Sequence, residues 1–303
     1  MTGIDDAVAD GDVLYNIITA AAVSTDGSYS GFDAANVSVT NTDNDTAGIT
    51  VSPTTGLITT EAGGSDTFTV VLTSQPTADV TIALSSSDLT EGTVGAASLT
   101  FTAANWNVAQ TVTVTGVDDA IADGDVLYNI ITAAAVSSDG NYSGLDPADV
   151  SVTNTDNDTA GITVSPTTGL TTTEAGGSDT FTVVLTSQPT ADVVVGLSSS
   201  DTTEGTVGPA SLTFTAANWN VAQTVTVTGV DDAIADGDIG YTILTAAAVS
   251  SDTTYNGINP DDVSVTNTDN DTAGITVTPT TGLITTETGG TATFTVVLTS
   301  QPT

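Results

Sequence analysis

The feature that most constrains this chain is a repeat with a period of 113 residues. The string VTNTDNDTAGITV begins at Val39, again at Val152 and again at Val265. Residues 46–158 and residues 159–271 differ at 16 of 113 positions, which leaves 113 − 16 = 97 identical. A repeat of this length is long enough to form one folding unit. The chain is therefore expected to be an array of near-identical domains.

The repeat divides the chain into four segments. Residues 46–158 and 159–271 are complete repeats, each expected to form a β-sandwich. Residues 1–45 match the C-terminal part of a repeat, and residues 272–303 match the N-terminal part. We expect the chain to be a segment of a longer array, in which the partial repeats continue into further chain or complete one another between molecules.

Short segments of each complete repeat alternate apolar residues with Thr or Ser, which is the period-two pattern of half-buried strands. Turn-forming residues separate these segments, and no helical period of useful length appears. Seven short strands in about 100 residues predict an all-β fold, a tandem of seven-stranded antiparallel Greek-key β-sandwiches of the Ig-like type. The apolar positions of the seven segments in the first complete repeat are Ile49 and Val51; Phe68, Val70 and Leu72; Val80, Ile82 and Leu84; Leu99 and Phe101; Val112 and Val114; Tyr128 and Ile130; and Val150 and Val152.

The charge balance excludes several classes of partner. The chain has 37 acidic residues and no lysine, arginine or histidine, so its formal net charge is −37. Nucleic acids and anionic membrane surfaces are bound mainly through Lys and Arg, and we expect neither as a partner. An apolar content of 39% argues against disorder. Cysteine is absent, so disulfides are excluded, and no apolar run approaches the ~20 residues of a transmembrane helix.

The acidic residues gather in loops between the predicted strands. Carboxylates brought together there repel one another by about 3 kcal/mol per pair at ~5 Å and an effective dielectric near 20. Because the chain has no lysine or arginine, only a cation from solvent can relieve this repulsion. Clustered carboxylate, amide and carbonyl oxygens suit Ca²⁺ better than zinc or copper. The alternative is that these loops are solvated turns, in which aspartate is common for backbone reasons.

The order of motifs resembles a known family. The string TVTGVDDAIADGD, a tyrosine-containing segment, and VSVTNTDND running directly into AGITV together resemble a Calx-β domain, in the version repeated in large bacterial surface adhesins. The resemblance covers both complete repeats and, in register, both partial ones. It implies calcium at the pole of each sandwich that lies next to the following domain.

The resemblance also implies a set of carboxylate ligands. In the first complete repeat these are Glu61, Asp88, Asp118, Asp119, Asp123, Asp156 and Asp158. Their counterparts in the second are Glu174, Asp201, Asp231, Asp232, Asp236, Asp269 and Asp271. Glu91 and Asp125 are reserve candidates.

Two departures from the family pattern leave the number of ions per repeat open. Ala120 stands where the family often has a third loop aspartate, and Asn157 interrupts the closing acidic triplet. Asp139 and Asp252 lie in a separate loop, where a role in turn formation is expected rather than ligation.

Each complete repeat has one tryptophan, Trp106 or Trp219. We expect it to be an apolar cap over one end of the sandwich. The alternative is a platform on which a carbohydrate stacks.

These observations favour a structural role over a catalytic one. The first hypothesis is a calcium-stiffened extender, stalk or filament subunit of a secreted, cell-surface protein of the adhesin type. Its partners would be neighbouring repeats of the same or identical chains, including filament self-assembly. The alternative is a calcium-dependent module that binds carbohydrate or protein. No enzyme is expected, because His, Cys and Lys are absent and the clustered acids are better explained as metal ligands.

Overall fold

The structure is a computed structural model that describes residues 1–303, and it consists of strands and turns without a helix. Accordingly, no helix is long and apolar enough to span a membrane. The chain forms two compact units. The first contains Met1–Asp119 and Gly124–Asn157, and the second contains Ala120–Asp123 and Asp158–Thr303.

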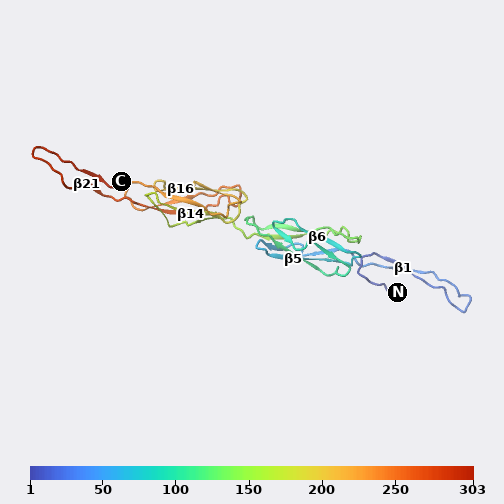
Figure 1. Ribbon diagram of the computed structural model, residues 1–303. Helices are drawn as coiled ribbons and strands as arrows, with labels where there is room; N and C mark the ends of the chain where they lie inside the picture. The colour runs from blue at the N-terminus through green and yellow to red at the C-terminus, as the bar shows by residue number, and fades with distance from the viewer. The chain divides into compact units, whose positions relative to one another are not determined.

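The first complete repeat is a sandwich of two sheets, labelled in part in Figure 1. The five-stranded sheet has the order β4-β11-β10-β6-β8 and the four-stranded sheet the order β3-β5-β9-β7. The strand bounds are β3 (Ile49–Ser52), β4 (Leu57–Thr60), β5 (Ser65–Leu72), β6 (Val80–Ser86), β7 (Gly92–Val94), β8 (Ser98–Phe101), β9 (Gln110–Gly116), β10 (Val126–Thr132) and β11 (Val150–Thr155).

The second complete repeat has the same arrangement, with sheet orders β13-β20-β19-β15-β17 and β12-β14-β18-β16. Its strands are β12 (Ile162–Ser165), β13 (Leu170–Thr173), β14 (Ser178–Leu185), β15 (Val193–Ser199), β16 (Gly205–Gly208), β17 (Ser211–Phe214), β18 (Gln223–Gly229), β19 (Ile239–Thr245) and β20 (Val263–Thr268).

The predicted all-β sandwich is confirmed, with two strands per repeat beyond the seven expected. The additional strands are β4 and β7, which have four and three residues. Neither shows the apolar alternation, because β4 buries Leu57 and Thr59 but exposes Ile58, and β7 contains a single large apolar side chain, Val94. β4 also pairs parallel with β11, whereas every other pair in this repeat is antiparallel.

The core lies between the two sheets and follows the alternation in the sequence. In β5, the side chains of Phe68, Val70 and Leu72 are at most 3% exposed, while the residues between them are half-buried. Burial of each such side chain contributes about 1.5–3 kcal/mol. Trp106 is half-buried and packs against this core, and Trp219 packs in the same way in the second repeat.

The partial repeats form isolated antiparallel pairs. β1 (Val13–Ile17) pairs with β2 (Val37–Asn41), and β21 (Ile275–Thr278) pairs with β22 (Thr295–Leu298). Without the remaining strands, side chains that belong in a core are exposed. Tyr29 is 65% exposed, whereas its counterpart Tyr142 in the first complete repeat is 1% exposed.

A buried tyrosine and a buried aspartate join two loops at one end of each sandwich. The hydroxyl of Tyr142 donates to the carbonyl of Ser74 at 2.7 Å and accepts from the Ser74 amide at 3.1 Å. The Asp139 carboxylate accepts from the amides of Thr77 and Asn141, at 2.8 and 2.9 Å. Burial alone would raise the pKa of Asp139, but these donors outweigh it and lower the pKa. Asp139 therefore has the turn-forming environment expected from the sequence.

We expect Tyr142→Phe to lower the free energy of unfolding of the first complete repeat by about 1–3 kcal/mol, because the buried Ser74 amide loses its acceptor. Tyr29→Phe is the matched control and should change stability by less than about 0.5 kcal/mol, since Tyr29 is exposed. Urea unfolding followed by Trp106 fluorescence in a Trp219→Phe background measures this repeat selectively. Equal midpoints for the two variants would contradict the role given to the Tyr142 hydroxyl.

Candidate metal centre

The parallel strand pair brings two acidic positions together. In the second repeat β13 and β20 run parallel, with Thr173 opposite Thr268 at their last residues. The next residues along the two chains are Glu174 and Asp269, which therefore leave the sheet side by side. Oxygen atoms of Glu174, Asp269 and Asp271 lie within 4.8 Å of one another. We call these three residues the exit group.

Backbone amides fix the carboxylates of the exit group. The Glu174 side chain is 4% exposed and accepts from the amide of Asn270 at 3.0 Å. The Asp269 carboxylate accepts from the amides of Asp271 and Gly237, at 2.6 and 2.7 Å. The loop after β18 is thereby tied to the end of β20.

A second set of acids lies at the same end of the repeat. Oxygen atoms of Glu204, Asp232 and Asp236 lie within 4.8 Å of one another, and we call these residues the loop group. Glu204 immediately precedes β16, and Asp232 and Asp236 lie in the loop after β18. Glu204 is 8% exposed, and the Asn267 side-chain amide donates to it at 3.4 Å.

The electrostatics of both groups are those of crowded carboxylates. The Asn270 amide lowers the pKa of Glu174, but burial and the charges of Asp269 and Asp232 raise it more, so the net shift is upward. Burial raises the pKa of Glu204 above its ordinary value, and the charges of Asp236, Asp201 and Asp232 add to this shift. Because the amide of Gly237, the residue after Asp236, donates to Asp269, the two groups belong to one acidic region.

Two of the predicted ligands in this repeat lie outside both groups. The Asp201 carboxylate accepts from the hydroxyl and amide of Thr203, at 2.5 and 2.9 Å, and these bonds lower its pKa. The Asp231 carboxylate accepts from the side-chain amide of Asn270 at 3.0 Å. Asp201 therefore holds a turn, and Asp231 fixes the asparagine that interrupts the acidic triplet.

The first complete repeat has the corresponding arrangement within its unit. Oxygen atoms of Glu61 and Asp156 lie within 4.8 Å of one another, as do those of Glu91 and Asp119. Glu61 and Glu91 are 3% and 6% exposed. Four predicted ligands remain. Asp88 accepts a hydrogen bond from Thr90, and Asp118 accepts one from Asn157. Asp123 and Asp158 lie in segments that belong to the second unit.

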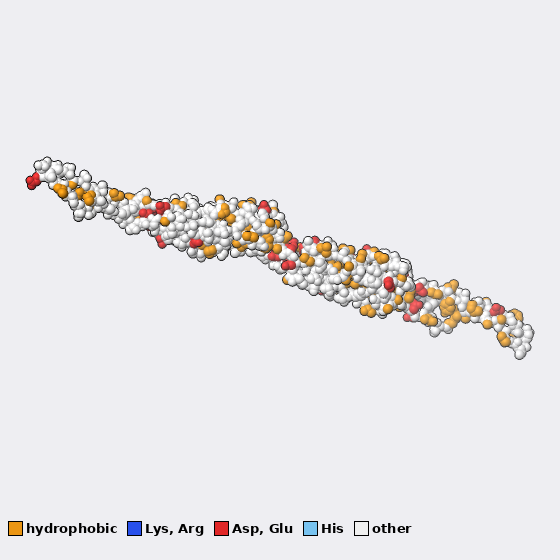
Figure 2. Space-filling view, in the orientation of Figure 1, with side chains coloured by type: hydrophobic (Ala, Val, Ile, Leu, Met, Phe, Trp, Pro, Cys, Tyr) orange, Lys and Arg blue, Asp and Glu red, His pale blue; other side chains and the backbone are white.

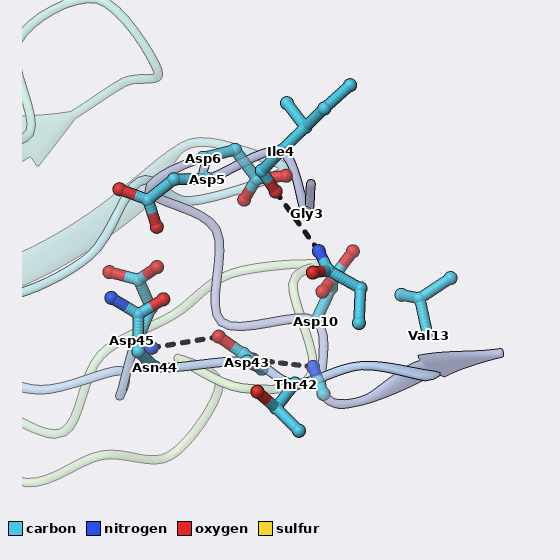
Figure 3. A pocket seen from close by; sticks show the side chains of 12 residues that line it. Gly3, Ile4, Asp5, Asp6, Asp10, Val13, Thr42, Asp43, Asn44 and Asp45 are labelled. Atoms are coloured by element: carbon cyan, nitrogen blue, oxygen red, sulfur yellow. Dashed lines mark hydrogen bonds between the residues drawn. The ribbon is translucent and has the colours of Figure 1, made fainter. Parts of the chain in front are cut away.

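The N-terminal partial repeat gathers the aspartates of this region around one cavity of about 240 Å³ (Figure 3). The Asp43 carboxylate accepts from the amides of Gly11 and Asp45, at 2.6 and 2.8 Å. The other acidic residues around the cavity are Asp5, Asp6 and Asp10. All of the acidic residues that line this cavity are aspartates.

These residues suit a hard divalent cation. All of the side chains in the two groups offer carboxylate oxygens, and each group contains one buried glutamate. Figure 2 shows acidic side chains gathered in patches, and the chain has no lysine or arginine to neutralise them. Ca²⁺ takes six to eight oxygen ligands in flexible geometry, which such loops can supply together with carbonyls and water.

The sequence pattern makes Glu91 only a reserve candidate and indicates no role for Asn154. Asn154 is 1% exposed, and its side-chain amide donates to Glu91 at 3.4 Å and to the Val117 carbonyl at 3.1 Å. The available signal was the glycine after Glu91, which begins β7. Recognition of that short strand would have placed Glu91 at a strand end, beside the loop that follows β9.

No family model and no curated protein matches this chain. Similar solved structures include CBD12 from CALX1.2, at 13% identity and a TM-score of 0.32, covering 73% of this chain and 99% of that one. The calcium binding domain CBD12 of CALX1.1 matches at 17% identity and a TM-score of 0.32, covering 66% and 80%. The E. coli chaperone DraB matches at 8% identity and a TM-score of 0.26, covering 72% and 98%. At these values the likeness concerns the fold alone.

In metal-free buffer, we expect the first complete repeat to lose stability as pH rises. Burial raises the pKa of Glu61 from 4.5 to about 7, and the charges of Asp156 and Asp119 add to the shift. Between these values the folded state holds a proton that the unfolded state has lost, so stability falls through this window. The melting temperature should therefore decrease from pH 5 to pH 7.5.

The matched variants are Glu61→Gln, which should flatten this pH dependence, and Asp79→Asn, which changes an exposed aspartate and should leave it unchanged. Thermal unfolding monitored by Trp106 fluorescence, in a Trp219→Phe background, checks the three profiles. A melting temperature that rises over the same range in the unmodified chain would contradict the assignment.

Proposed function

We propose that this chain is part of a calcium-stiffened extender, in which repeats joined end to end form a stalk or filament on a cell surface. The observation that carries the proposal is the position of the exit group. Asp269 and Asp271 are the last acidic residues of one repeat, and the next repeat begins at Thr272. A cation held by these residues and Glu174 fixes the segment that connects successive domains.

The connecting segment itself supports this role. Asp271 is followed by Thr272, Ala273 and Gly274, and β21 begins at Ile275. No Pro-rich or Gly/Ser-rich spacer separates the end of one repeat from the first strand of the next. With so little free chain, immobilising the acidic end of a repeat restricts the angle to its neighbour.

The composition favours a passive role for the chain surface. Repeats that are identical at 97 of 113 positions (113 − 16) lengthen the array without adding different binding surfaces. We further propose an extracellular location, where calcium is abundant enough for sites of modest affinity. On this proposal the partners are neighbouring repeats, within one chain or between identical chains, and the acidic groups bind metal rather than catalyse a reaction.

A binding module is the second candidate, but the tryptophans give it little support. Trp106 and Trp219 are half-buried and pack against their cores, which is the environment of a structural cap. A stacking platform for carbohydrate would require an exposed aromatic face.

We expect millimolar Ca²⁺ to raise the melting temperature of the full chain strongly relative to excess EDTA, with Mg²⁺ much less effective. An ion present at about 100 times its Kd stabilises the folded state by ~2.7 kcal/mol, because it binds the folded state only. Mg²⁺ demands octahedral geometry and retains its water, so loops of this kind suit it poorly. Scanning calorimetry with and without each cation measures the effect.

Two substitutions separate ligation from turn formation. Glu204→Gln should remove much of the calcium-dependent stabilisation of the second repeat, because Glu204 is the buried member of the loop group. Asp201→Asn is the matched control, since its carboxylate is engaged with Thr203 and should leave the calcium effect largely intact. Equal melting temperatures of the unmodified chain in Ca²⁺ and in EDTA would refute the proposed function.

A further inference from the structure

The N-terminal partial repeat and both complete repeats carry an uncharged tripeptide inside an acidic loop. The tripeptide is Ala7–Ala9 in the N-terminal partial repeat, with counterparts at 120–122 and 233–235. We call it the docking loop. Aspartates flank it on both sides, yet Ala7, Val8 and Ala9 are all half-buried. Apolar side chains do not bind cations, so other parts of the protein must cover these residues.

In the first unit, the cover is the following repeat. The backbone amide of Gln75 donates to the carbonyl of Ala7 at 2.6 Å. The side-chain amide of Asn141 donates to the carbonyl of Ala9 at 2.6 Å. Gln75 and Asn141 both belong to the first complete repeat, whereas the docking loop belongs to the partial repeat before it.

The same backbone contact recurs twice within the second unit. The amide of Gln188 donates to the carbonyl of Ala120 at 2.6 Å, and the amide of Gln301 donates to the carbonyl of Ala233 at 2.5 Å. Ile234 also forms a parallel β-bridge with Gln301. Three docking loops therefore use the main chain of the corresponding glutamine in the same way.

The receiving surface is held rigid by buried groups. Gln75 lies between Ser74, which is hydrogen-bonded to Tyr142, and Thr77, whose amide donates to Asp139. Asp139 also accepts from the amide of Asn141, the residue whose side chain reaches Ala9. The donors that meet the docking loop are thus fixed within their own repeat.

We propose that each repeat carries a metal-independent docking site, formed by the turn at Gln75 and the loop at Asn141, for the docking loop of the preceding repeat. Both donors are neutral amides and both acceptors are backbone carbonyls, so neither chelation nor titration removes the contact. Two successive repeats are then joined by two separable devices, an acidic region that needs a cation and a hydrogen-bonded contact that does not.

The two complete repeats differ at this site. Thr254 stands where the first repeat has Asn141, so the second repeat lacks the side-chain amide that reaches the docking loop. A cavity of about 270 Å³ lies among Ile121, Ala122, Gln188 and Thr254 in the second unit. The docking site of the first complete repeat is accordingly the stronger of the two.

Distance measurements on the full chain in excess EDTA test the proposal. The chain has no cysteine, so pairs of spin labels can be placed without background. One pair, at Asn16→Cys and Thr100→Cys, reports the first docking site, and the equivalent pair, at Asn129→Cys and Thr213→Cys, reports the second. All four positions are exposed.

We expect a narrow distance distribution for the first pair in EDTA. Asn141→Thr, which installs the residue found in the second repeat, should increase the undocked population roughly two- to tenfold, the range for loss of one hydrogen bond. The reciprocal variant Thr254→Asn should decrease the undocked population of the second pair by a similar factor. Amide exchange at Gln75 should accelerate in Asn141→Thr by the same proportion.

Two outcomes would overturn the proposal. One is a broad distribution in EDTA that neither substitution changes, which would mean that only a cation joins the repeats. The other is a narrow distribution insensitive to both substitutions, which would assign the contact to other residues. Because every measurement is made without calcium, failure here is independent of failure of the calcium-dependent extender.

Discussion

Repulsion among carboxylates that no lysine or arginine can relieve is the constraint on which the rest of the structure depends. With 37 acids and no basic side chain, the protein satisfies its carboxylates by backbone amides, by hydroxyls and by the amides of Asn. Asp201 and Asp139 are satisfied in this way, and the pKa of each is lowered. The buried glutamates Glu61 and Glu204 are crowded by other acids, and the pKa of each is raised. Acids whose donors hold a turn are thus distinct from buried acids that lie among other carboxylates.

The fold concentrates these crowded acids at one end of each repeat. Parallel pairing of β4 with β11, and of β13 with β20, places the last residues of both strands at the same edge of a sheet. The Asn154 side chain then connects Glu91 to the Val117 carbonyl beside the loop after β9. The loops joined by Tyr142 and Asp139 contain no such cluster and present neutral donors instead. One repeat therefore has two chemically distinct sets of loops.

The sequence predicted the β-sandwich because alternation in the long strands is regular, as in β5 and β9, and because turn residues separate them. It did not predict β4 and β7, in which apolar residues do not alternate with Thr or Ser. Missing β7 affected the site, since β7 begins directly after Glu91. Glu61 and Asp156, which the parallel register of β4 sets side by side, were both predicted ligands. Spacing along the chain identified acidic loops, but it could not distinguish Asp88, which bonds its own turn, from Glu91, which is buried. That distinction depends on contacts between residues far apart in sequence.

The strand that closes each sandwich has a consequence for how the array folds. β11 is the last strand of its repeat, and it pairs with β4 through residues such as Val152 and Leu57, which are 95 positions apart. Closing so long a loop is slow, and no repeat can complete its five-stranded sheet before its final residues are available. Until then, a vacant edge beside β4 would accept the identical strand of a neighbouring repeat equally well. Synthesis from the N-terminus, which completes one repeat before the next closing strand appears, thus protects an array of near-identical domains from exchanging strands.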